Sequence, residues 1–80
     1  MTMMTDKQMG YLVWNAAAKR PDIRYPDGTR YGGLHCGNTI EVLVRDKWVA
    51  TRMEYSHDTG RWYLVGMGGS REFLGLSVRK

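Results

Sequence analysis

The chain has 80 residues, which allow one small domain and no more. Hydrophobic residues make up 42% of the chain and charged residues 25%, a balance that is ordinary for a soluble globular domain. The chain has twelve Lys and Arg residues and eight Asp and Glu residues, so its formal net charge is +4. This charge favours a polyanion as partner, although a small domain can carry the same charge for solubility alone.

Several other classes of protein are excluded by the same totals. No apolar run approaches the about 20 residues that a membrane-spanning helix needs, and the first eight residues lack the basic-then-apolar pattern of a secretory signal. The single cysteine, Cys36, cannot form an internal disulfide, which favours a reducing compartment. We therefore expect a cytoplasmic protein without a membrane partner. Residues 1–8 are expected to form a flexible tail and residues 9–80 a single domain.

The first half of the chain predicts two strands joined by a turn. Gly10–Trp14 is rich in strand-forming residues. Asn15–Arg20 contains three alanines, but Pro21 limits any helix there to little more than one turn, so we expect a turn or a short helical connection. Asp22–Tyr25 alternates polar and apolar residues and ends at the turn sequence of residues 26–28.

The second half predicts an antiparallel meander followed by one more strand. The strands of the meander, expected from alternation and turn residues, are Thr39–Val44, Lys47–Tyr55 and Arg61–Gly66. Tight turns separate them, at residues 45–47 and 56–60. A flexible loop at residues 68–71 and a last strand at Leu74–Arg79 complete the pattern. Five or six short strands joined by Gly-rich turns predict an all-β fold, a small SH3-like barrel of five to six antiparallel strands, with an open five-stranded sheet as the rival.

Several short segments of the sequence resemble one small bacterial family, the domain of unknown function 5348. These segments are Gly10–Val13, Gly32–Gly37, Ile40–Val42, Trp48, Thr51–Tyr55, Trp62–Gly66 and Gly75–Arg79. Their order and spacing are similar to that family from about residue 10 to residue 79. The resemblance implies a short, stand-alone cytoplasmic domain, often encoded near mobile genetic elements. The family has no assigned activity, so the resemblance supplies no catalytic residue.

The segment around Cys36 could in principle be a reactive or metal-binding site. A structural zinc site needs four ligands, and the soft ones here are only His35, Cys36 and His57. A catalytic cysteine needs a base within reach, whereas adjacent residues of a strand point to opposite faces. We therefore expect no metal, no cofactor and no enzymatic activity. Instead we expect Leu34 and Cys36 to face the core, His35 to face outwards, and the flanking glycines to shape a turn.

Nine aromatic residues are too many for a core this small to bury completely. Exposed rings beside guanidinium groups suit single-stranded nucleic acid on a small barrel. The candidate nucleic-acid-binding residues are Arg24, Arg45, Trp48, Arg52, Arg61 and Trp62. The alternative is structural: the tryptophans plug the two barrel ends, and Arg52 lies across an indole ring and pairs with Glu54 or Glu41.

These observations favour a non-enzymatic binding module, with nucleic acid slightly ahead of protein as the partner. The alternative is a protein-interaction or accessory domain of a mobile genetic element, for example an inhibitor of a host factor, that binds its partner through an aromatic groove. The positive net charge argues against mimicry of DNA, which would need an acidic surface. The oligomeric state is left open by the sequence.

Overall fold

The computed structural model describes residues 8–67 and 73–80 of the chain, and their regular structure is entirely β. The strands are β1 (Met9–Asn15), β2 (Arg20–Arg24), β3 (Thr39–Val44), β4 (Lys47–Ser56), β5 (Arg61–Leu64) and β6 (Ser77–Arg79). In these two ranges there is no helix, and therefore none long and apolar enough to cross a membrane. The predicted all-β class is confirmed.

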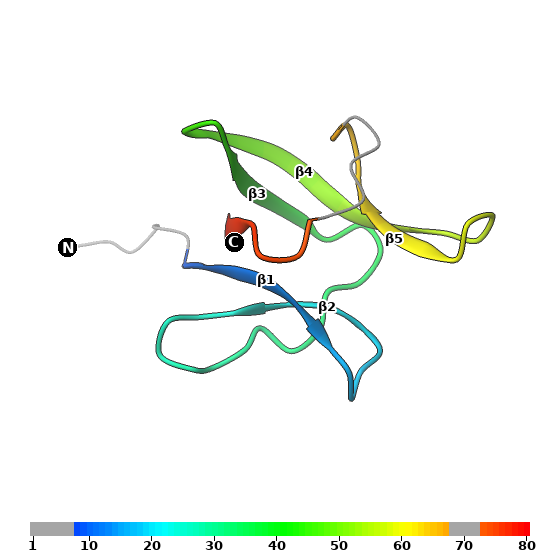
Figure 1. Ribbon diagram of the computed structural model, residues 1–80, viewed down its shortest axis with the longest axis horizontal. Helices are drawn as coiled ribbons and strands as arrows, with labels where there is room; N and C mark the ends of the chain where they lie inside the picture. Colours follow the sequence, from blue (N-terminus) through cyan, green and yellow to red (C-terminus); the bar gives the residue numbers. More distant parts are fainter. Residues whose placement is uncertain (1–7, 68–72) are drawn as a thin grey trace.

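The six strands form one antiparallel sheet in the order β2-β1-β6-β3-β4-β5 (Figure 1). The short strand β6 pairs with β1 on one side and with β3 on the other. It thereby joins the β1–β2 hairpin to the β3–β4–β5 meander. The sheet curls into a half-barrel whose end strands are β2 and β5. The prediction of a small barrel-type fold with five to six antiparallel strands is confirmed.

The strand boundaries differ from the predicted ones mainly where the chain turns. Strand β3 has the predicted bounds, and residues 16–19 form a turn rather than a helix. Strand β5 ends at Leu64 instead of Gly66, because Gly66 has a φ of 76° and the chain reverses there. Strand β6 begins at Ser77 instead of Leu74. The predicted loop at residues 68–71 lies outside the described residues.

The predicted tail meets the sheet at its last residue. Gln8 and Lys80 exchange two backbone hydrogen bonds, of 3.2 and 3.1 Å, which extend the pairing of β1 with β6 by one step. Residues 1–7, the rest of the predicted tail, lie outside the described residues. The two ends of the sheet-forming chain are therefore neighbours.

One face of the curled sheet carries the hydrophobic core. Its buried apolar side chains are Leu12, Ile23, Tyr25, Leu34, Ile40, Val42, Met53, Leu64, Phe73 and Val78. We call the face that carries them the inner face, and the opposite face the outer face. Ile40, Val42 and Val44 share the inner face as the alternation of β3 predicts, although Val44 is only half-buried.

Asp22 in β2 is a fully buried carboxylate that pins a loop to the sheet. Its Oδ1 accepts hydrogen bonds from the backbone N–H groups of Ile23, Gly32 and Gly33 at 2.8 to 2.9 Å, and its Oδ2 accepts one from the Asn15 side-chain amide at 2.9 Å. Burial alone would raise the pKa of the Asp22 carboxyl, but the four donated hydrogen bonds outweigh it and lower the pKa below its ordinary value.

The segment that Asp22 holds runs along the outer edge of β2. Backbone hydrogen bonds join Tyr25 to Thr29, Tyr31 to Ile23, and Leu34 to Pro21. These contacts give β2 a neighbour on the side that faces away from β1. One end of the sheet is therefore covered by the chain itself.

Candidate nucleic-acid interface

The outer face is assembled from residues that alternate with the core positions. Because Leu12, Val42, Met53 and Val78 point inwards, their neighbours in the same strands point outwards. The large or charged side chains that this rule places on the outer face include Tyr11, Arg24, Glu41, Trp48, Arg52, Glu54, Arg61, Tyr63 and Arg79. Four arginines, two glutamates and three aromatic rings thus share one surface.

Its centre is a stack of side chains from three neighbouring strands. The Arg79 guanidinium of β6 lies over the Trp48 ring of β4, with its carbon 4.3 Å from the ring centroid. The Arg79 Nε donates to Glu41 Oε1 of β3 at 2.7 Å. This carboxylate fixes the guanidinium above the indole, so Trp48 is half-buried although it faces away from the core.

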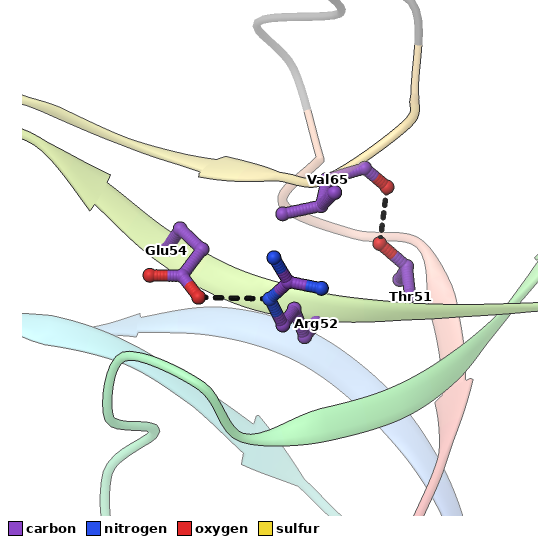
Figure 2. A network of polar contacts seen from close by, with 4 residues as sticks. All are labelled: Thr51, Arg52, Glu54 and Val65. Atoms are coloured by element: carbon purple, nitrogen blue, oxygen red, sulfur yellow. Dashed lines mark hydrogen bonds and ion pairs between the residues drawn. The ribbon is translucent and has the colours of Figure 1, made fainter.

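Arg52 and Glu54 form a separate ion pair on the same face, as Figure 2 shows. The Nε of Arg52 lies 2.9 Å from Oε2 of Glu54, and the Arg52 side chain is 53% exposed. The structural alternative stated above is thus partly met: Arg52 pairs with Glu54, but the cation over the indole is Arg79. Arg79 was not a predicted site residue, because its contact with Glu41 joins positions 38 residues apart and no local pattern announces it.

The second predicted tryptophan lies on the other side of the sheet. Trp62 of β5 is half-buried, packs against the core and stands opposite Tyr55 of β4, with 5.2 Å between the ring centroids. The Arg20 guanidinium approaches the same ring, 5.5 Å from its centroid. Trp48 and Trp62 therefore cannot form a single binding surface.

The remaining predicted arginines are exposed and spread along the sheet. Arg24 ends β2 directly opposite Tyr11 of β1, Arg61 begins β5, and Arg45 occupies the β3–β4 turn. Within the described part of the chain, no acidic side chain forms an ion pair with any of these three arginines. All three guanidinium-bearing side chains are exposed to solvent.

The prediction that Cys36 faces the core is wrong. Leu34 is fully buried and His35 is exposed, as expected, but Cys36 is exposed as well. The reason is local: the Asn38 side-chain oxygen accepts the His35 N–H at 2.7 Å and Gly37 has a φ of 88°, so the chain turns after Leu34 and the alternation of a strand no longer applies.

The neighbouring imidazole has a partner of its own. Arg20 Nη1 lies 2.8 Å from His35 Nδ1, and because a guanidinium only donates, the Nδ1 atom accepts this hydrogen bond. Among residues 8–67 and 73–80, no three His, Cys, Asp or Glu side chains gather as metal ligands would. The outer face instead carries guanidinium groups, which bind phosphates, and aromatic rings, which stack on bases.

Comparison with known proteins places the chain in a family. Residues 10–80 match the family described as Domain of unknown function (DUF5348). The chain is similar to the crystal structure of a structural-genomics target from Ruminococcus gnavus, with 42% sequence identity and a TM-score of 0.79. The similarity covers 91% of this chain and 100% of that chain. No curated protein matches the chain. As the resemblance of its short segments predicted, the chain belongs to the DUF5348 family.

Proposed function

We propose that this protein is a small non-enzymatic module that binds nucleic acid through the outer face of its sheet. The observation that carries the proposal is the mixture of arginines and exposed rings on that face. Tyr11 is 52% exposed and Tyr63 is 41% exposed. Arg24 stands beside Tyr11 on the neighbouring strand. We also propose a cytoplasmic location, which the single cysteine supports because it favours a reducing compartment.

Charge and ring chemistry act on different parts of such a ligand. Guanidinium groups at Arg24 and Arg61 would neutralise phosphates and release counterions, which makes binding weaken as salt rises. The tyrosine rings would stack on unpaired bases, a contact worth about 1–3 kcal/mol per base. Trp48 contributes less directly, because Arg79 already lies over its ring. The ligand that fits both kinds of group is a single strand.

The test is a titration of labelled single-stranded and double-stranded oligonucleotides at two or more salt concentrations. We expect the single strand to bind more tightly, with affinity that falls as salt rises. Arg24→Gln should reduce the slope of log affinity against log salt by about 1, the share of one phosphate contact. Tyr11→Ala should weaken binding roughly 5- to 150-fold, the loss of one stacked base.

A matched control removes one positive charge away from the outer face. Lys19 lies in the β1–β2 turn with a φ of 56°, a conformation that Asn also adopts, so Lys19→Asn should leave both affinity and slope unchanged. The proposal is overturned if no oligonucleotide binds at low salt. It is also overturned if Lys19→Asn and Arg24→Gln have equal effects, since the binding would then follow net charge and not this face.

A further inference from the structure

The edge of β4 is open over half of its length. Strand β4 has ten residues and β5 has four, and β5 pairs only with Met53–Ser56. One more hydrogen bond, from Val65 N–H to Arg52 C=O, extends this pairing by one step. Beyond it, the backbone of Lys47–Thr51 has no hydrogen-bond partner on the β5 side among the residues that the structure describes.

Hydrogen bonds elsewhere in β4 show which backbone groups this leaves unpaired. Met53 donates its N–H towards β3, to the carbonyl of Asn38, whereas Arg52 accepts from Val65 on the opposite side. Backbone groups of a strand alternate between its two edges, so the even-numbered residues face the β5 side. The N–H and C=O groups of Trp48 and Ala50 therefore point out of the sheet.

At residues 65–67, directly after β5, the chain turns away from this edge. Gly66 adopts a left-handed backbone and the Met67 N–H returns to the Leu64 carbonyl at 3.4 Å. The Thr51 hydroxyl donates to the Val65 carbonyl at 2.6 Å, a bond that Figure 2 shows at the point where the two strands separate. Whereas the edge of β2 is covered by residues 29–34, no part of ranges 8–67 and 73–80 pairs with the outward backbone groups of Trp48 and Ala50 on the edge of β4.

We propose that this edge pairs with the same edge of a second copy of the chain, antiparallel and about a two-fold axis at Val49. In that register Trp48 of each copy stands opposite Ala50 of the other, and all four outward N–H groups meet all four outward C=O groups. An axis at Trp48 or at Ala50 would form two of these four hydrogen bonds. The two-fold axis at Val49 is therefore the register that pairs all the outward backbone groups of Trp48 and Ala50.

The side chains agree with this register. On the outer side, the large Trp48 ring comes beside the small Ala50 of the second copy, and on the inner side Val49 meets Val49. Val49 is 36% exposed in the single chain, so pairing would remove an apolar side chain from water. Lys47 stands opposite Thr51, which means that no like charges are directly opposed within the paired segment.

The test is the oligomeric state of the full chain, measured by sedimentation equilibrium from about 10 µM to about 1 mM, the range that suits a small interface. We expect a reversible monomer–dimer equilibrium. Ala50→Pro removes two of the four donors and should weaken the dimer at least about tenfold, because proline on an open edge deletes only the outward N–H. Ala50→Ser retains the N–H and is the matched control, expected to dimerise like the parent chain.

A second pair of variants keeps the test valid if proline disturbs the fold. Val49→Lys places two ammonium groups face to face at the axis and should weaken the dimer roughly tenfold or more, and Val49→Glu should do the same. A mixture of the Lys and Glu chains should form a heterodimer more readily than either chain dimerises alone. A monomer at every concentration, or a dimer indifferent to Val49→Lys, overturns the inference. Neither result depends on the proposed nucleic-acid binding, whose assay is separate.

Discussion

At the scale of single residues, Asp22 is the buried charged side chain within ranges 8–67 and 73–80. It is fully buried, and four N–H groups donate to it. From the sequence, Asp22 was predicted only to begin an alternating strand, and its burial was not predicted. The reason is that two of its donors, Gly32 and Gly33, come ten and eleven positions later, where a predicted turn offered no indication of what it packs against.

Asp22→Asn should lower the free energy of unfolding by about 1–3 kcal/mol at neutral pH. The amide keeps one accepting oxygen, but its NH₂ group would face the Asn15 amide that now donates to Oδ2. Because the folded-state pKa of Asp22 is lowered, its stabilisation is fully present above the ordinary pKa of 3.8 and is lost as pH falls below that value. The cost of Asp22→Asn should therefore shrink below about pH 4.

Urea denaturation at several pH values measures this difference. Asp58→Asn is the control, since Asp58 is exposed in the β4–β5 turn and the change should be close to neutral. An Asp22→Asn cost that stayed constant down to pH 2 would show that the hydrogen bonds do not favour the charged form.

At the scale of elements, the hairpin of β3 and β4 follows closely from local sequence. Alternation located β3 to the residue and β4 to within one residue, because polar and apolar side chains alternate along β3 and turn residues bound both strands. The polar turn at residues 45–47 was also predicted, but not its geometry. Arg45 has a φ of 50° and Asp46 a φ of 67°, so both central residues of the turn are left-handed, as in a type I′ turn.

Asp46→Gly should therefore stabilise the protein by roughly 0.5 kcal/mol, because glycine adopts this φ without a steric penalty. The matched control is Asp58→Gly in the β4–β5 turn, where φ is negative and glycine adds only freedom to the unfolded chain. Thermal unfolding should give changes of opposite sign for the two substitutions. Equal effects would mean that the left-handed turn carries no strain.

At the scale of the whole molecule, the order of the strands in the sheet could not be predicted from the sequence. Strand β6 lies between β1 and β3, and only contacts across long stretches of chain place it there. Periodicity tells which face of a strand is buried but not which strand is its neighbour. For the same reason the predicted site was incomplete: Trp48 and Arg52 were named, whereas Arg79, which β6 delivers to Trp48, was not. Trp62 was grouped with Trp48 although alternation places them on opposite faces.

Val78→Ala should lower the free energy of unfolding by about 1.5–3 kcal/mol. Val78 is fully buried and stands opposite Gly10 of β1 and Val42 of β3, so the lost methyl groups leave a cavity where the two halves of the sheet meet. Leu74→Ala, at a side chain that is 45% exposed, should cost much less under the same urea titration. Equal costs would indicate that β6 is not the link between the two halves.

The position of β6 also predicts which step of folding is slowest. Each hairpin closes through a short turn, an event of about 1–10 µs. Strand β6, in contrast, must find a strand near the start of the chain and another 38 positions before it. Closing such long loops is entropically slow, so we expect the β1–β2 hairpin and the β3–β4–β5 meander to form before the three-residue strand β6 joins them.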